Sequence, residues 1–321
     1  MRKNLNNEHI EGRIYQHSLE LKTVKNQASA NFGKTFIGGT IEVAVDEAGM
    51  NVIPVEFTYV VETTKNGGKN KTYTELMKII ENGKTWMTDG PEFATKVSID
   101  TALALNDFCV NDGNEYTMVS QKINQGGFVT IVSALKEDEA LRNTFKTDML
   151  ITNVSRVDAN PENNIEEDFV KVRGAVFDFR NSLLPVEFVV KNPAGMAYFE
   201  DLEASNANPI YTQVWGRINH ATESFKKQVD SAFGAPAVDI KERKIREWII
   251  TGTLKVPYDF GDEKVMTMEE VVKASQDRET YLADVKKRRV EYDAQKTTAS
   301  APVANFGVPT PSVAPTGKFS F

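Results

Sequence analysis

A short sequence motif, the repeated phrase, occurs twice in this chain and limits the folds that the chain can adopt. Residues 52–60 read V-I-P-V-E-F-T-Y-V and residues 183–190 read L-L-P-V-E-F-V-V, with the shared Pro-Val-Glu-Phe segments 131 positions apart. Each copy follows an alternating stretch and a turn. Because alternation of apolar and polar residues places one side of a strand in a core, the repeat predicts two similar β-hairpins. Duplication and similar packing demands both remain open as its cause.

Strand patterns surround both copies. Runs of β-branched and aromatic residues predict strands within residues 12–24, 36–45, 52–61, 149–157, 169–179, 183–190, 210–218 and 246–254. Capping-box spacing predicts a helix after Thr72 and Glu75, and a charged helix after Thr267 and Glu270 that reaches about residue 295. Residues 133–142 predict a further helix. The stretch 297–321 holds four prolines and one charged residue, so it is predicted to be a disordered tail.

The net charge, the cysteine count and the lengths of the apolar runs exclude some classes of protein. A net charge of −7 argues against a general coat protein of duplex DNA, although it leaves room for a local basic surface. The single cysteine, Cys109, excludes an intramolecular disulfide and fits a reducing compartment. Since the chain shows neither a signal peptide nor a run of about 20 apolar residues, we expect a protein of the cytoplasm, of the host cell if it is viral.

No motif in the chain names a reaction. Phe32-Gly33-Lys34-Thr35 ends like a phosphate-binding loop, but Ala28 stands where that loop needs its first glycine. The three histidines are far apart, and no G-x-S-x-G is present. We therefore expect no enzyme activity, no metal and no cofactor.

Two strands of the second region combine cations with aromatic rings on one face. With period two, the strand from Val170 to Arg180 presents on one side Lys171, Arg173, Ala175, Phe177 and Phe179. The strand from Tyr211 to Ile218 presents Tyr211, Gln213, Trp215 and Arg217. Such a face suits single-stranded nucleic acid, because cations follow phosphates and rings stack on bases. The alternative is that these rings are core residues.

The series V-K-V-R-G-A-V, V-E-F-V-V and V-W-G-R-I resembles the strands of OB-fold single-stranded DNA-binding proteins, in a divergent bacteriophage type. The resemblance is best over residues 170–218 and implies a glycine that bends the first long strand and an aromatic-Gly-basic end to a later one, here Trp215-Gly216-Arg217. It also implies a disordered tail that ends in phenylalanine and recruits replication or recombination proteins. The stretch K-F-S-F (318–321) departs from that pattern because it has no acidic residue.

The resemblance implies a β-rich fold, all-β to α+β, with one or two OB-like β-barrels, a helical insertion, a C-terminal helix and a disordered tail. The expected division is 1–62, first β-rich region; 63–146, mixed insertion; 147–258, OB-like nucleic-acid-binding region; 259–296, C-terminal helix; 297–321, tail. Whether one barrel or two are formed stays open.

The favoured function is non-enzymatic binding of single-stranded DNA in phage replication or recombination. The candidate contacts are Lys34, Phe36, Lys69, Lys71, Tyr73, Lys171, Arg173, Phe177, Phe179, Arg180, Trp215 and Arg217. A virion structural or scaffolding protein is the alternative, and an enzyme with a dispersed site is a third reading. We expect no membrane partner, and the oligomeric state is open.

Overall fold

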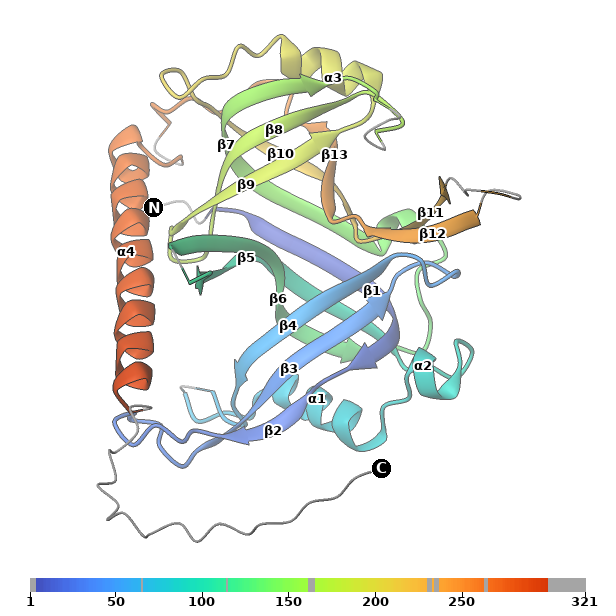
Figure 1. The fold of residues 1–321 in the computed structure, drawn as a ribbon, viewed down its shortest axis with the longest axis vertical. Coiled ribbons are helices and arrows are strands. Elements are labelled where there is room, and N and C mark those ends of the chain that lie inside the picture. Colours follow the sequence, from blue (N-terminus) through green and yellow to red (C-terminus); the bar gives the residue numbers. More distant parts are fainter. Residues whose placement is uncertain are drawn as a thin grey trace, which may run out of the picture.

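Ten of the strands form two closed sets of five, one above the other in Figure 1. A computed structural model describes residues 4–299 apart from 65, 114, 161–164, 230–232, 234–236 and 263–264. The predicted tail therefore lies, except for its first three positions, outside the described residues. Among the described residues, no helix is both long enough and apolar enough to span a membrane.

The first barrel comes from the N-terminal half of the chain. Its elements are β1 (Asn6–His17), β3 (Thr35–Ala44), β4 (Val52–Val60), β5 (Lys96–Asn111) and β6 (Tyr116–Ile131), with the short β2 (Glu20–Thr23) beside β3. Strand β1 pairs with β3, β3 with β4, β4 in parallel with β6, β6 with β5, and β5 with β1. Helices α1 (Lys71–Asn82) and α2 (Trp86–Asp89) lie between the third and fourth barrel strands. This closed five-stranded order is that of an OB-fold.

The second barrel repeats the same order. Its elements are β7 (Asn143–Val157), β8 (Phe169–Phe177), β9 (Leu183–Val190), α3 (Pro193–Glu200), β10 (Ile210–Asn219) and β13 (Glu247–Thr253). Strand β7 pairs with β8, β8 with β9, β9 in parallel with β13, β13 with β10, and β10 with β7. The expected β-rich, OB-like fold with a C-terminal helix is confirmed, and the number of barrels is two.

The repeated phrase falls on the same hairpin of each barrel. Strands β3 and β4 occupy the second and third places in the first barrel, as β8 and β9 do in the second. The alternating residues of the phrase point into the core, since Val55, Phe57, Val186 and Phe188 are all buried. The two copies lie in equivalent hairpins with equivalent packing, which explains why their sequences are similar.

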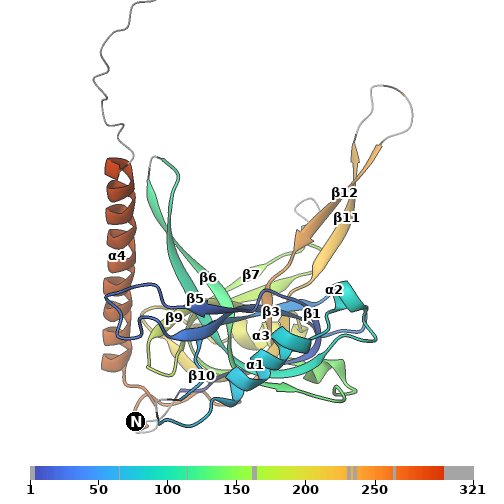
Figure 2. The ribbon, with the colours of Figure 1, turned by 90° about the horizontal axis from the view of Figure 1, so that it is seen from below.

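The segment 63–146 contributes more than an insertion. It contains the predicted helix α1, whose N-cap is Asn70 and not Thr72, and the short helix α2, which was not predicted. It also supplies β5 and β6, which complete the first barrel. Both strands continue beyond the barrel as a long hairpin. The second barrel carries its own long hairpin, β11 (Thr222–Val229) and β12 (Ala237–Lys244), between its last two strands. Figure 2 shows that both hairpins project from the same side of the molecule.

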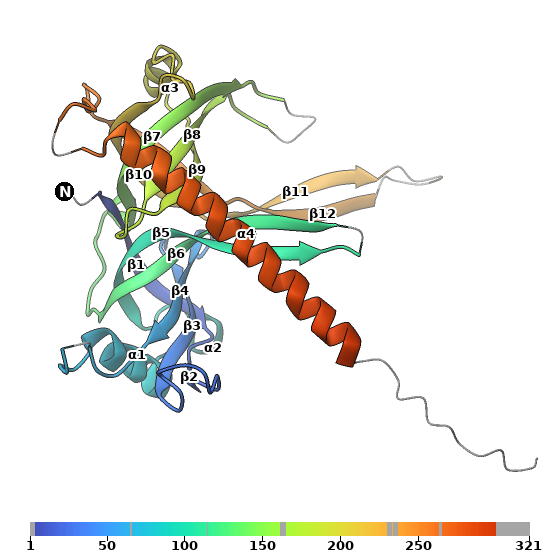
Figure 3. The same ribbon diagram turned by 90° about the vertical axis from the view of Figure 1, so that its left-hand side faces the viewer.

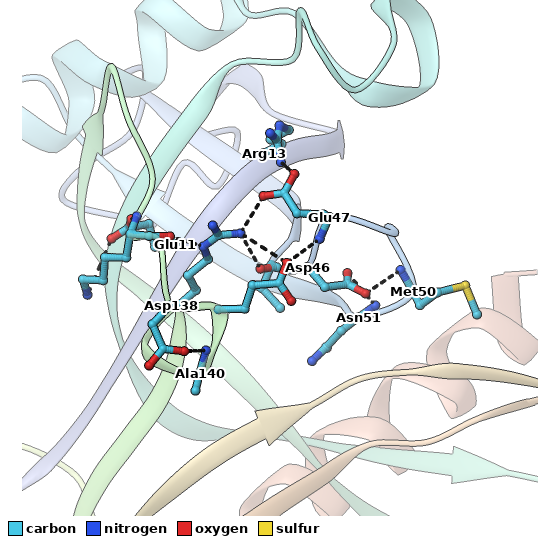
Figure 4. Close-up of polar contacts among 12 residues, drawn as sticks. Glu11, Arg13, Asp46, Glu47, Met50, Asn51, Asp138 and Ala140 are labelled. Atoms are coloured by element: carbon cyan, nitrogen blue, oxygen red, sulfur yellow. Dashed lines mark hydrogen bonds and ion pairs between the residues drawn. The ribbon is translucent and has the colours of Figure 1, made fainter.

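The prediction of a helix at 133–142 is wrong, because only a 3-10 turn at Glu139–Leu141 forms there. Polar groups of this linker bond to the first barrel as well as to each other (Figure 4). The Arg142 guanidinium donates to Glu47 Oε1 at 2.9 Å and to the carbonyl of Lys136 at 2.7 Å, while the amide of Glu11 donates to the Arg142 carbonyl at 2.7 Å. These tertiary bonds replace the helical ladder and hold the linker against the first barrel.

One hydrophobic core runs through both barrels, and a smaller second core lies on the outside of the second barrel. The second core packs Phe177 and Tyr211 against described residues within 258–262 and 265–274. Helix α4 (Met268–Ala299) begins at the predicted capping box, where the Glu270 amide donates to Thr267 Oγ1 at 3.2 Å and the Thr267 amide donates to Glu270 Oε2 at 3.0 Å. Figure 3 shows α4 running diagonally across the barrels and past the β5–β6 hairpin.

Candidate nucleic-acid interface

Two predicted cations lie together on the outer surface of the second barrel. Lys171 and Arg173 point outward from β8, and both face Glu187 on β9. Lys171 Nζ is 3.3 Å from Glu187 Oε1, and Arg173 Nε is 2.7 Å from Glu187 Oε2. Burial alone would raise the pKa of Glu187, but the hydrogen bonds from the two cations outweigh it and hold that pKa below its usual value. The group keeps one net positive charge and stays accessible to solvent.

Trp215 and Arg217 point outward from β10 of the same barrel. The Trp215 side chain is 36% exposed, and its indole lies on the backbone of Gly252 in β13, where an added Cβ would stand 2.4 Å from the indole nitrogen. Only glycine leaves room for a ring to lie flat on that strand. Trp215 is also the cross-strand partner of Lys146 on β7, an exposed cation that the sequence patterns missed.

The strand register joins these residues around the outside of the barrel. Arg217 is opposite Ile249, Ile249 is opposite Val189, and Val189 is opposite Lys171. Paired residues of neighbouring strands carry their side chains on the same side of a sheet. The predicted cations of β8 and β10, 40 or more positions apart in sequence, therefore belong to one outer row. We call Lys171, Arg173, Trp215 and Arg217 the barrel-2 surface.

A second aromatic and basic group lies on the first barrel. The Phe36 and Tyr59 rings have centroids 4.7 Å apart, with planes tilted by 39°. Lys22 is the cross-strand partner of Phe36, and exposed Lys34 donates to Asn31 Oδ1 at 3.0 Å in the adjoining loop. Phe36 and Lys34 were predicted, whereas Tyr59 and Lys22 were missed. We call these four residues the barrel-1 surface.

The remaining candidates have different positions. Lys69 and Lys71 are exposed at the start of α1, and Tyr73 on α1 is half-buried against the core. Phe179 and Arg180 lie in the turn after β8, where the guanidinium carbon is 5.0 Å from the ring centroid and the ring is 72% exposed.

The structure corrects the assignment of Phe177. Its side chain has no exposed surface and meets the Tyr211 ring edge-on, with centroids 6.2 Å apart. Phe177 does lie on the outer side of β8, but described residues within 258–262 and 265–274 cover that end of the strand. A covered ring offers no face to a base, so Phe177 is a core residue.

Helix α4 carries a cationic run that strand patterns did not reveal. Lys286, Lys287, Arg288 and Arg289 follow one another, and all four are exposed. Arg289 Nε bonds to Asp293 Oδ2 at 3.0 Å, one turn later. The signal in the sequence was the run K-K-R-R itself, which marks an electrostatic patch when it lies on an exposed helix.

The junction between the barrels is polar and buried. Glu8 of β1 accepts hydrogen bonds from Trp248 Nε1 of β13 at 2.8 Å and from Thr101 Oγ1 at 2.9 Å. Burial raises the pKa of Glu8 to about 7, although these hydrogen bonds and the charge of Lys122 oppose it. Lys122 Nζ of β6 lies 4.4 Å from the Trp248 ring centroid, and burial lowers its pKa to about 8. The β1–β7 ladder, in which Asn6–Ile10 pair with Asn143–Thr147, joins the two barrels, and one tryptophan and two ionisable groups add contacts between them.

A groove of about 1430 Å³ lies where β1, β5, β7, the turn after β8 and α4 meet. Three exposed rings line it, Phe128, Phe179 and Tyr281. Its carboxylates are Glu8, Asp100, Asp107, Asp178, Glu270 and Asp277, and its Lys and Arg side chains are Lys146, Arg180, Lys273 and Arg278. Carboxylates outnumber cations, which disfavours the groove as a track for phosphates. Within the described ranges, no three His, Cys, Asp or Glu side chains are placed to hold a metal ion.

Fold and surface together define a tandem OB-barrel protein with aromatic and cationic groups outside each barrel. The chain belongs to the YorF family, whose model matches residues 4–288. No curated protein matches it. Its fold is similar to that of the wild-type single-stranded DNA binding protein from Thermus aquaticus, with a TM-score of 0.46 and 11% identity over 81% of this chain and 96% of that one. A deletion mutant of that protein gives a TM-score of 0.45 and 12% identity over 82% and 100%. So weak a likeness does not bear on function.

Proposed function

We propose that the protein binds single-stranded DNA on the outside of its second barrel. The observation that carries this proposal is the barrel-2 surface, where an exposed tryptophan and three cations lie on the outer side of β8 and β10. OB-folds bind oligonucleotides on the face of their second and third strands, which here are β8 and β9, and through the loops next to it. Phosphates would pair with Lys171, Arg173 and Arg217, and a base would stack on Trp215.

The barrel-1 surface supplies a second contact for the same strand. Phe36 and Tyr59 present two neighbouring rings beside Lys22 and Lys34, which is the combination that binds bases and phosphates without sequence preference. The β1–β7 ladder and the buried junction hold the two barrels together, so both surfaces belong to one continuous sheet. A site of two barrels spans roughly 8–32 nucleotides at about 4–16 per OB-fold.

The role that we propose for this binding is to sequester single strands during phage DNA replication or recombination, without catalysis. Recruitment of replication or recombination proteins through residues 297–321 belongs to the same proposal. A pull-down of replication proteins by the full chain, lost on deletion of 300–321, tests it.

Fluorescence anisotropy with an oligo-dT of roughly 30 nucleotides at low salt tests the binding itself. Trp215→Ala removes one stacking ring, worth about 1–3 kcal/mol, so Kd should rise about 5- to 150-fold with the fold retained. Phe93→Ala is the matched control, because Phe93 is an exposed ring beside Lys84 that lies outside both surfaces. Its Kd should not change. Absence of binding by the wild-type chain at micromolar concentration refutes the proposal.

Two charge substitutions give a second test, because one should weaken DNA binding and the other should tighten it. Arg173→Ala removes a phosphate contact, so binding should weaken and the slope of log K against log salt should fall by about 0.7. Glu187→Gln releases Lys171 and Arg173 from their shared carboxylate, so binding should tighten. If both variants bind like the wild type, the barrel-2 surface is not the site.

A further inference from the structure

The groove at the junction of the barrels has the features of a site for an extended peptide. Beyond Thr101, β5 pairs within the described part of the chain with β6 alone, so its other edge is open toward the groove. The Asn6 side chain already bonds to this edge as a strand would: Nδ2 donates to the Leu103 carbonyl at 2.9 Å, and Oδ1 accepts from the Leu103 amide at 3.1 Å. An open edge of this kind accepts an added strand through its backbone groups.

The side chains of the groove define the chemistry of its occupant. Phe128 and Phe179 are 73% and 72% exposed, and Tyr281 is 46% exposed, so the described neighbours, with Arg180 beside Phe179, leave these rings open to solvent. Six carboxylates against four Lys and Arg side chains make it acidic. Nucleic acid is therefore a poor occupant, whereas an extended segment with aromatic residues and a positive charge is a good one.

One segment of this chain has that composition. Residues 316–321 read T-G-K-F-S-F, with two phenylalanines, one lysine, no carboxylate and no proline, and they lie outside the described residues. In an extended conformation, Phe319 and Phe321 share one side, and Lys318 points to the other. Segments nearer to α4 carry prolines at 302, 309, 311 and 315, which cannot donate to a ladder.

The connection is long enough. Helix α4 ends at Ala299, which is 18 residues or about 27 Å along the helix from Tyr281 in the groove. The 19 residues from Ala299 to Lys318 span up to about 60 Å when extended. We propose that residues 317–321 bind intramolecularly along the open edge of β5, with Phe319 and Phe321 among the exposed rings of the groove. This occupant goes beyond the proposed DNA binding, which uses other surfaces.

Photo-crosslinking of the full chain tests the proposal without DNA. With benzoylphenylalanine in place of Phe319, crosslinks should map to β5 residues 102–107, to the turn at 178–184 or to α4 residues 273–281. The same reagent in place of Phe306 is the matched control, and its crosslinks should not favour these segments. Mixing light and heavy isotope-labelled chains shows whether the link is within one chain. Crosslinks scattered over the surface, or only between chains, overturn the proposal.

Hydrogen exchange gives an independent reading. In the variant Phe319→Ala/Phe321→Ala, the backbone amides of Leu105 and Asp107, which face the open edge, should exchange about tenfold faster, equivalent to about 1.4 kcal/mol of lost docking. Phe179→Ala, which changes an exposed groove ring, should accelerate the same amides, and Phe93→Ala should not. Unchanged exchange in the double variant overturns the proposal. Oligo-dT affinity is measured separately, so failure of DNA binding leaves this result interpretable.

Discussion

Replacing Glu8 by glutamine should change how the stability of the protein depends on pH. Glu8 is buried at the junction and accepts hydrogen bonds from Trp248 and Thr101. Glutamine has the same shape: its carbonyl accepts from the Trp248 indole, and its amide donates to the Thr101 hydroxyl. The variant therefore keeps the contacts of the junction and removes only the ionisation.

The magnitude follows from the pKa. Burial raises the pKa of Glu8 from 4.5 to about 7, so between these pH values the folded state holds a proton that the unfolded state has released. Stability of the wild type then falls as pH rises, because ∂ΔGunfold/∂pH is negative where the folded state binds more protons. The full difference corresponds to about 3 kcal/mol, at 1.36 kcal/mol for each pH unit.

Urea unfolding of wild type and Glu8→Gln between pH 4 and pH 8 measures the effect. The free energy of unfolding of the variant, relative to wild type, should improve by about 3 kcal/mol across this range. Lys122 stays outside this window, because its pKa of about 8 makes its contribution change mainly at higher pH. Glu92→Gln, at an exposed position, is the control and should show a nearly constant difference. A difference for Glu8→Gln that stays within 1 kcal/mol refutes the account of a buried, costly carboxylate.

Three further changes test the packing. Gly252→Ala puts a Cβ 2.4 Å from the Trp215 indole, so the ring must swing away, and oligo-dT affinity should fall as in Trp215→Ala while the melting temperature changes little. Gly216→Ala puts a Cβ 1.9 Å from the Ile249 carbonyl oxygen, a backbone atom, so unfolding free energy should fall by about 2–3 kcal/mol; wild-type stability would contradict the β10–β13 register. Arg278→Ala leaves the Asp107 carboxylate with the Ser120 hydroxyl and no cation, costing about 3 kcal/mol and speeding amide exchange in α4, and Arg278→Met/Asp107→Leu should recover most of it.

Local alternation was enough to find most strands of the second barrel. The expected stretches 149–157, 183–190 and 210–218 coincide with parts of β7, β9 and β10, because their apolar residues recur every second position. Strands β5 and β6 were not recognised. Their outer halves form a hairpin that leaves the barrel, where Phe108 and Val110 are exposed, so the pattern of one buried side is broken.

Other features depended on contacts between distant segments. The sequence at 133–142 favours a helix, but the bonds of Arg142 and Lys136 to the first barrel outweigh that preference. Because these bonds join residues that are far apart in the sequence, no local sequence pattern predicts them. The same holds for the junction, where Glu8, Lys122 and Trp248 are brought together from three strands.

The two phenylalanines of β8 and its turn show where local information ends. Alternation correctly placed Lys171, Arg173 and Phe177 on the outer side of the strand. It did not show that described residues within 258–262 and 265–274 bury Phe177 while Phe179, two positions later, stays 72% exposed. Period two determines which way a side chain points, because it is a property of the strand itself. Whether that side meets water depends on which distant segment packs against it, and that is decided by the free energy of the whole fold.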